Sequence, residues 1–270
     1  MTTSAPSHSH TATGIFPAAA WHGPASGLCR RIDQGGIDLW RVDLAQRTAD
    51  AWPRALTPDE LARAGRFARR ELAERFLQCR FALRTLLAAY SGLPMHALPI
   101  QVSAQGKPQL PTALALGFNL SHAGGHALIA IGRQRGIGVD IECGVPAGDL
   151  KALARQVFSE AEWPVLSPLG GDDLARAFLL GWTRKEACLK ALGTGLLLEP
   201  DRIDAGLSSG TQRVRPLPAR APVAVTSLVM EAGGQAAPSS AALAVSEVGA
   251  DRLGAVHYLT FGPHAPWEHD

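Results

Sequence analysis

The order of helical and strand-like segments is the feature that most constrains how this chain of 270 residues can fold. Residues 57–91 and 149–192 carry helical patterning. Each stretch is followed by short apolar runs that glycine, proline or asparagine interrupt, which is typical of antiparallel strands. Because helices followed by strands occur twice, the sequence predicts an α+β fold in which two similar lobes pack together.

Changes in composition set the boundaries of these lobes. Residues 1–35 are rich in Ser, Thr, Ala, Gly and Pro and are predicted to be a flexible leader, and 263–270 a tail. The N-terminal α+β lobe is expected to cover 36–142 and the C-terminal α+β lobe 149–262. The segment "CGVPAG" at 143–148 is expected to link the two lobes.

Local signals place several elements within this frame. The first helical stretch begins at a capping signal, with Thr57 three residues before Glu60. The segment "SGLP" is expected to end it. The apolar runs at 126–132 and 136–142 are joined by "RQR" and are predicted to form an antiparallel hairpin.

Composition argues against several classes of protein. A hydrophobic fraction of 46% with 19% charged residues describes a soluble globular chain. The formal net charge of +2, without a dense run of Lys and Arg, gives no reason to expect nucleic acid as a partner. The four cysteines show no CxxC spacing, which argues against a zinc site or a disulfide scaffold and favours a cytoplasmic location. We expect neither a secretory signal nor a membrane span.

Two carboxylates alternate with apolar residues in "GIGVDIE". A strand places Asp140 and Glu142 on one face, with their Cα atoms about 6.5–7 Å apart. At an effective dielectric constant of about 20, like charges at that distance repel by roughly 2 kcal/mol. On an exposed strand the pair is simply part of a polar face. On a covered face it requires a cation, and a set of oxygen ligands favours Mg²⁺.

A second stripe of polar groups is predicted in "GWTRKEACLKALG". Helical steps of four residues place Trp182, Glu186 and Lys190 on one face. An ordinary surface Glu–Lys pair, worth about 0.3–0.5 kcal/mol, explains this spacing. Taken alone, the segment favours this ordinary pair, and a stripe that presents a carboxylate and an ammonium to one ligand is the alternative interpretation.

The segment "FNLSHAGGHA" places Asn119, Ser121 and His122 near a strand end, before glycines that permit close approach of a ligand. Adjacent strand residues face opposite ways and no GxSxG motif is present, which argues against a hydrolytic triad. In the functional interpretation, the Ser121 hydroxyl and the His122 imidazole bind a phosphate. In the alternative, the segment is an ordinary strand end without a ligand. Lys107 in "QGKP" lies at a predicted turn.

Taken in order, "QGKP", "FNLSHAGG", "GIGVDIE" and "WTRKEACLKALGTGL" resemble the signature segments of the Sfp-type 4′-phosphopantetheinyl transferases. Each segment is common by itself, and their order and spacing make the resemblance specific. It extends from about Leu56 to Pro200, weakens in the C-terminal strands and is absent from residues 1–35.

The resemblance implies two α+β lobes related by pseudo-twofold symmetry, with coenzyme A bound between them. The implied reaction moves 4′-phosphopantetheine from coenzyme A to a serine hydroxyl of an apo acyl, peptidyl or aryl carrier protein and releases 3′,5′-adenosine bisphosphate. It implies Mg²⁺ as cofactor, with Mn²⁺ as an alternative. The carriers would belong to fatty-acid synthesis or to secondary metabolite biosynthesis. An active site completed within one chain implies a monomer.

The resemblance also assigns individual residues. The implied metal ligands are Asp140, Glu142 and Glu186. The implied catalytic residues are Glu186, Lys190 and His122. The implied coenzyme A contacts are Arg63, Arg75, Arg80, Lys107, Pro108, Ser121, His122, Asp140 and Lys190. Glu60 departs from the family pattern, because some relatives carry a lysine at this position. A carboxylate would repel phosphate, so Glu60 is not counted among the implied coenzyme A contacts.

Two other functions fit the same polar residues. A Mg²⁺-dependent hydrolase of nucleotide or phosphate esters would use the carboxylates and lysines but would release free phosphate. A non-catalytic module that binds coenzyme A or carrier proteins would bind without Mg²⁺ and without turnover.

Overall fold

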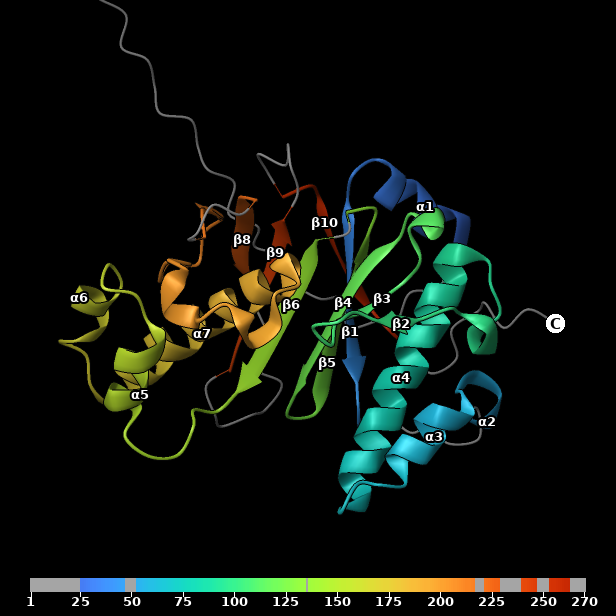
Figure 1. Ribbon diagram of the computed structural model, residues 1–270, viewed down its shortest axis with the longest axis horizontal. Coiled ribbons are helices and arrows are strands. Elements are labelled where there is room, and N and C mark those ends of the chain that lie inside the picture. Colours follow the sequence, from blue (N-terminus) through green and yellow to red (C-terminus); the bar gives the residue numbers. More distant parts are fainter. Residues whose placement is uncertain are drawn as a thin grey trace, which may run out of the picture.

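The structure, a computed structural model, describes residues 25–46, 52–134, 136–216, 221–228, 239–246 and 253–262. Two long helices, α4 (Arg70–Ser91) and α7 (Gly171–Leu192), lie on opposite sides of the sheets in Figure 1. Between them two four-stranded sheets pack against each other. The predicted α+β fold class is therefore confirmed, as a helix, sheet, sheet, helix arrangement.

The elements follow one another in the order that Figure 1 shows by colour. The other α-helices are α1 (Ala25–Asp33), α2 (Trp52–Ala55), α3 (Pro58–Ala64), α5 (Leu150–Val157) and α6 (Trp163–Leu166). Short 3₁₀ helices are η2 (Met95–Ala97), η3 (Thr112–Leu114), η4 (Gly195–Leu197) and η5 (Pro200–Arg202). The strands are β1 (Ile37–Asp43), β2 (Gln101–Val102), β3 (Pro108–Gln109), β4 (Gly117–Ala123), β5 (His126–Gly132), β6 (Ile137–Cys143), β7 (Gln212–Val214), β8 (Val223–Leu228), β9 (Ser239–Ser246) and β10 (Val256–Thr260).

The predicted helical stretch after residue 57 consists of two helices. The Thr57 side chain accepts a hydrogen bond from the Glu60 main chain, and the Glu60 carboxylate accepts one from the Thr57 main chain, so the predicted capping box is present at α3. A break at 65–69 separates α3 from α4, and Gly92, with φ of 72°, ends α4 in the left-handed conformation.

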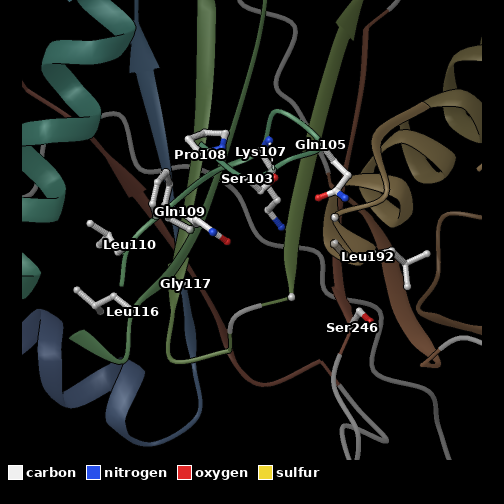
Figure 2. A pocket seen from close by; sticks show the side chains of 14 residues that line it. Ser103, Gln105, Lys107, Pro108, Gln109, Leu110, Leu116, Gly117, Leu192 and Ser246 are labelled. Atoms are coloured by element: carbon white, nitrogen blue, oxygen red, sulfur yellow. Dashed lines mark hydrogen bonds between the residues drawn. The ribbon is translucent and has the colours of Figure 1, made fainter. Parts of the chain in front are cut away.

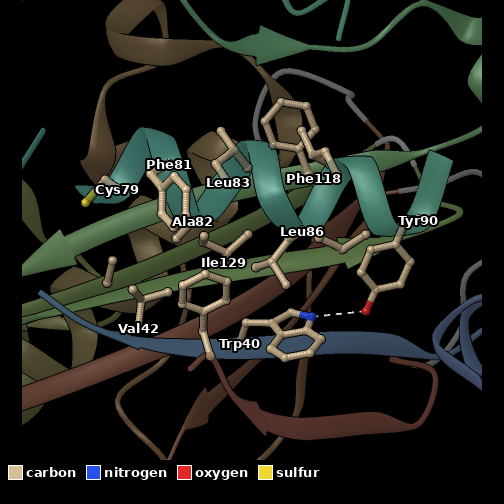
Figure 3. Packing of buried hydrophobic residues seen from close by; sticks show 14 of the residues in the cluster. Trp40, Val42, Cys79, Phe81, Ala82, Leu83, Leu86, Tyr90, Phe118 and Ile129 are labelled. Carbon is tan, nitrogen blue, oxygen red and sulfur yellow. Dashed lines mark hydrogen bonds between the residues drawn. The ribbon is translucent and has the colours of Figure 1, made fainter. Parts of the chain in front are cut away.

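The first hydrophobic core lies between α4 and the sheet that contains β1 and β5. Figure 3 shows Phe81 and Leu86 of α4 facing Trp40 and Ile129 of the strands. The Trp40 indole donates a 3.0 Å hydrogen bond to the Tyr90 hydroxyl, so its one polar group is paired inside the core. Each such fully buried large side chain contributes about 1.5–3 kcal/mol.

A second core joins the two sheets. Leu39 of β1 and Leu128 of β5 pack with Val139 of β6 and Leu243 of β9, all without exposed surface. A third core, beneath α7, includes Ala187 and residues of β8 and β9. None of the helices in the described ranges is both long and apolar enough to cross a membrane.

The two sheets have the strand orders β10-β1-β5-β4 and β6-β9-β8-β7. Within the first sheet, β1, helix α4 and the hairpin β4–β5 follow in sequence, and β1 pairs with β5. Within the second, β6, helix α7 and the antiparallel pair β8–β9 follow, and β6 pairs with β9. The two halves therefore share one connectivity, which agrees with the repeated element order of the sequence.

The predicted hairpin between 126–132 and 136–142 is wrong. These segments form β5 and β6, which belong to different sheets. Both edges of β5 are occupied, because β1 pairs with one and β4 with the other. Strand β6 pairs with β9 instead, at a much greater sequence separation that local patterning does not reveal.

The lobe boundaries also differ from the prediction. Strand β6 was expected in the N-terminal lobe at 36–142, but it is part of the second sheet, so the change of sheet occurs at 133–136 and not at 143–148. Strand β10 was expected in the C-terminal lobe at 149–262, but it pairs in parallel with β1. The last strand thus closes an edge of the first sheet that would otherwise have unpaired main-chain groups.

Part of the predicted leader is ordered. Helix α1 lies within residues 1–35, and its Leu28 and Ile32 are fully buried in the first core. Its Arg31 donates two 3.0 Å hydrogen bonds to the buried Asp38. The helical spacing of Leu28 and Ile32 was not recognised in the sequence, because small and polar residues surround these two apolar side chains. Residues 1–24 and the predicted tail at 263–270 lie outside the described residues.

Candidate active site

Strand β6 and helix α7 meet at a glycine. A Cβ atom at Gly138 would collide with the Ala187 carbonyl oxygen and with the Ala191 main chain, so only glycine permits this approach. The helix backbone therefore lies directly on the strand. This close packing brings the stripe of α7 over the strand face that carries Asp140 and Glu142.

Asp140 is the most buried of the predicted site residues, with 3% of its surface exposed. Its Oδ1 accepts a 2.6 Å hydrogen bond from the Lys190 ammonium and a 2.8 Å bond from the Ser121 hydroxyl. Its Oδ2 is buried and has no hydrogen-bond partner within the described residues. The carboxylate thus has one satisfied oxygen and one open to a further ligand.

Lys190 joins three elements through one ammonium group. Besides Asp140, its Nζ donates to the Ser121 hydroxyl of β4 at 3.1 Å and to the Val139 carbonyl of β6 at 3.3 Å. The resemblance implies that this ammonium contacts coenzyme A, and in the structure it donates to the Asp140 carboxylate. The side chain keeps partial exposure, 28%, so it also lies at the surface of the site.

Glu142 and Glu186 flank the Asp140–Lys190 pair. The Trp182 indole donates a 3.3 Å hydrogen bond to Glu142, which gives this aromatic residue of the stripe a polar role. Burial raises the pKa of Glu142, and the Asp140 charge raises it further. Burial likewise raises the pKa of Glu186, with the charges of Asp140 and Glu142 opposing that of Lys190.

The pKa of Asp140 is also raised by burial, against the opposite effect of Lys190. Three carboxylates with raised pKa values in one neighbourhood form a set of oxygen donors that a cation would stabilise. Within the described ranges, no three acidic, histidine or cysteine side chains are close enough together to form a ready-made metal cluster. The carboxylates therefore fit a hard cation by their chemistry, through the open Asp140 Oδ2 above all, but do not form a closed cage.

Positive charge lies beside this acidic group. Partial burial lowers the pKa of His122, and the nearby charges of Lys190 and Arg75 lower it further. Arg75 comes from α4 and His122 from β4, on the face of the first sheet that α4 covers. His122, Arg75 and Lys190 thus form a group of donors suited to an anion.

Two of the predicted arginines have other partners. Glu60 accepts hydrogen bonds from Arg80 at 2.6 Å and from Arg84 at 2.7 Å. Burial acts to raise the pKa of Glu60, but the Thr57 main chain and the two arginines hold it below its usual value. The guanidinium of Arg63 lies 5.2 Å from the centre of the Phe76 ring. The departure at Glu60 is therefore structural, since its carboxylate ties α3 to α4.

Lys107 and Pro108 line a cavity of about 340 Å³ between the β2–β3 hairpin and the end of α7, which Figure 2 shows. Pro108 pairs with Val102 in the hairpin. The Lys107 ammonium donates to the main-chain carbonyls of Ile137 at 2.9 Å and Lys190 at 2.6 Å. The resemblance assigns this ammonium to coenzyme A, whereas the structure places it on main-chain oxygens.

Three polar residues outside the predicted set of site residues have partners inside the protein. Asn119 Oδ1 accepts a 2.8 Å hydrogen bond from the Val139 main chain and so connects β4 with β6. Arg184 and Lys185, beside Glu186 in the sequence, are fully buried. Lys185 forms a 2.6 Å ion pair with Glu162. Arg184 and Lys185 do not belong to the face of α7 that carries Trp182, Glu186 and Lys190. That position is the sequence signal that their side chains point into the protein.

Residues 136–245 match the family model described as the 4′-phosphopantetheinyl transferase superfamily. Residues 44–134 match a second model, described as 4′-phosphopantetheinyl transferase, N-terminal. The limit between the matches coincides with the change from the first sheet to the second.

Three relatives illustrate the range of similarity. The 4′-phosphopantetheinyl transferase HetI of Nostoc sp. is 38% identical over 165 residues, which are 59% of this chain and 70% of the relative. The 4′-phosphopantetheinyl transferase of Bacillus subtilis is 31% identical over 153 residues, 57% of this chain and 67% of the relative. The human L-aminoadipate-semialdehyde dehydrogenase-phosphopantetheinyl transferase is 28% identical over 166 residues, 57% of this chain and 54% of the relative.

Proposed function

Because the chain belongs to the 4′-phosphopantetheinyl transferase superfamily, we propose that it transfers 4′-phosphopantetheine from coenzyme A to a serine hydroxyl of an apo carrier protein. The other product is 3′,5′-adenosine bisphosphate. The carrier is an acyl, peptidyl or aryl carrier domain of fatty-acid or secondary metabolite synthesis. The enzyme acts as a cytoplasmic monomer of the Sfp type, and its two halves are related by a pseudo-twofold axis, a proposal that their common connectivity supports.

One observation carries the proposal. The Asp140 carboxylate lies where β4, β6 and α7 meet, with the Lys190 ammonium and the Ser121 hydroxyl on one oxygen and no partner within the described residues on the other. An acidic group with an open oxygen, next to the donors His122, Arg75 and Lys190, suits a ligand that combines phosphate with a divalent cation.

The acidic residues Asp140, Glu142 and Glu186 would hold Mg²⁺ or Mn²⁺. Such an ion, when bound, supplies positive charge to the pyrophosphate oxygens of coenzyme A. The open Oδ2 of Asp140 and the raised pKa values of all three carboxylates support this assignment.

The other residues bind phosphate or move a proton. Lys190, Arg75 and His122 donate to phosphate oxygens and stabilise the charge that develops on the leaving group. The carrier serine oxygen forms a bond to the β-phosphorus while the bond from that phosphorus to the oxygen bridging to the α-phosphate breaks. Glu186 accepts the serine proton, directly or through a water.

Mass spectrometry of several apo-carrier domains after incubation with the protein, coenzyme A and Mg²⁺ tests the proposal. We expect a carrier mass gain of one phosphopantetheine. Release of free phosphate without that gain would instead indicate a hydrolase. Binding of coenzyme A or carrier without Mg²⁺ and without turnover would indicate a non-catalytic module.

A further inference from the structure

Among the strands of the described residues, β6 is at the edge of its sheet and pairs with a neighbour on one side only. On one side it pairs with β9 along its whole length. In an antiparallel strand, alternate residues direct their main-chain groups to opposite edges. Ile137 and Val139 direct theirs to the edge that faces β4, a strand of the other sheet. Buried main-chain groups at such an edge need partners.

Side chains from a turn, a strand and a helix supply these partners. The Lys107 ammonium donates to the Ile137 carbonyl at 2.9 Å. Asn119 Oδ1 accepts from the Val139 main-chain N–H at 2.8 Å, and the Lys190 ammonium donates to the Val139 carbonyl at 3.3 Å. The three side chains take the place of a strand, and they do so immediately before Asp140.

The second hydrogen bond of Lys107 extends this arrangement to α7. Its ammonium donates to the Lys190 carbonyl at 2.6 Å, in the last turn of the helix. The same carbonyl accepts a 3.2 Å hydrogen bond from the Gly193 N–H at the end of the helix, and a cation at a last turn interacts favourably with the helix dipole. One ammonium thus fixes the start of β6 and the main chain of the residue whose side chain reaches Asp140.

The turn that carries Lys107 is itself held in shape. Ser103 donates its main-chain N–H to the Lys107 carbonyl at 2.9 Å, and the Lys107 N–H donates to the Ser103 hydroxyl at 3.1 Å. Gly106, with φ of 84°, adopts the left-handed conformation that the turn requires. Figure 2 shows Lys107 extending from this turn, with Ser103 beside it. The ammonium therefore starts from a constrained position.

We propose that Lys107 is a positioning residue, which holds the main chains of β6 and α7 in the register that keeps the Lys190 ammonium on Asp140. The inference rests on the proposed transfer reaction. It differs from the role that the resemblance assigns to Lys107, a contact with coenzyme A. The two roles predict different kinetics, because a positioning residue acts on the chemical step and a binding residue acts on affinity.

Steady-state kinetics of Lys107→Met separates the two roles. We expect kcat to fall about tenfold or more, with KM for coenzyme A changed by less than about twofold. Combined with Lys190→Met, the loss should be no more than about twofold greater than in Lys190→Met alone, since residues that act through one another are not additive. A raised KM with unchanged kcat would overturn the proposal. Lys151→Met, on the exposed surface of α5, is the matched control.

Lys107→Gln provides a second variant that keeps a hydrogen-bond donor but removes the charge. If the donor matters, kcat should recover in part relative to Lys107→Met. An equal KM defect in both neutral variants, with kcat unchanged in both, would instead show that the charge binds a phosphate.

Hydrogen exchange of the unliganded protein gives a readout that needs no activity. In Lys107→Met we expect main-chain amides at 186–193 to exchange faster than in wild type, and in Lys151→Met to exchange at the wild-type rate. Unchanged exchange in Lys107→Met would overturn the positioning role even if the enzyme transfers phosphopantetheine. Failure of wild type to modify any carrier would count against the proposed function alone, since the exchange result does not depend on it.

Discussion

Asp140 combines burial, one ion pair and one open carboxylate oxygen. Removing water from a carboxylate is costly, and the Lys190 ammonium offsets that cost at Oδ1 only. Buried polar atoms usually have hydrogen-bond partners, and Oδ2 has none within the described residues, which fits its proposed role as a ligand of a cation. The two oxygens of Asp140 therefore have different roles: Oδ1 binds the Lys190 ammonium, and Oδ2 is the oxygen offered to a ligand.

Asp140→Ala and Glu186→Ala should each abolish transfer while the protein remains folded. The first removes the open oxygen, and the second removes the proposed base. We expect rates at least about 10²-fold lower, as for loss of a group that acts on the transition state. Carrier modification followed by mass spectrometry gives the rate, and circular dichroism reports the fold. The control is Glu160→Ala, which removes an exposed acidic side chain. Full activity of either site variant would contradict the assignment of these residues to a metal site.

Lys190→Ala should lower kcat by well over tenfold, where each decade corresponds to about 1.4 kcal/mol of transition-state stabilisation. The lost ammonium both compensates Asp140 and lies among the proposed phosphate donors. Steady-state kinetics with varied coenzyme A provides the measurement. An effect confined to KM would mean that Lys190 contributes only uniform binding.

At the scale of elements, the contact between β6 and α7 determines whether the two polar patterns meet. Gly138 allows the helix to lie on the strand, and Gly193, with φ of 67°, ends the helix just after Lys190. Neither strand nor helix forms a site alone, because Asp140 belongs to one and Lys190 to the other.

Gly138→Ala should destabilise the protein by about 1–3 kcal/mol or more, because the added methyl group meets the Ala187 carbonyl and the helix must move. Denaturant unfolding measures the change. Gly125→Ala is the matched control, since a Cβ there meets nothing within 4 Å. Equal stability of the two variants would show that the helix yields without cost and that the close approach is not required.

Lys185 and Glu186 are neighbours with opposite expected phenotypes. Lys185→Met leaves Glu162 as a buried carboxylate without its ammonium, and we expect a loss of about 3–5 kcal/mol of unfolding free energy. The folded fraction should keep a kcat near that of wild type, because Lys185 points away from the site. Thermal unfolding and kinetics below the transition test both parts, and a large kcat defect with wild-type stability would contradict them.

At the scale of the whole molecule, the C-terminal strand closes the first sheet. Strand β10 pairs with β1, and His257 Nδ1 lies 2.9 Å from the buried Asp38 carboxylate. The adjoining Leu259 and Phe261 belong to the core beneath α4. The second half of the chain therefore contributes directly to the stability of the first.

Truncation after Ser246 should prevent stable folding, because it removes β10 and exposes both the edge of β1 and part of the first core. Truncation after Gly262 retains β10 and is the control. Soluble yield and cooperative thermal unfolding measure the outcome. A shorter chain that unfolds with the wild-type midpoint would show that β10 is dispensable.

The sequence by itself determined the types of the long helices and of most strands, the capping box at Thr57, and which residues share one face of β6 and one face of α7. These follow from local rules: strand period two for Asp140 and Glu142, and helical period near four for Glu186 and Lys190. Local periodicity fixes which face a side chain occupies, so these predictions required no knowledge of distant contacts.

Only the tertiary structure decided which strands pair and which partners the charged side chains choose. The β5–β6 hairpin failed because both edges of β5 are taken by β1 and β4. Arg80 binds Glu60 and Lys107 binds two main-chain carbonyls, although sequence resemblance had assigned both to coenzyme A. Long side chains reach whatever acceptor long-range packing brings near, and one sequence pattern does not specify contacts made across tens of residues.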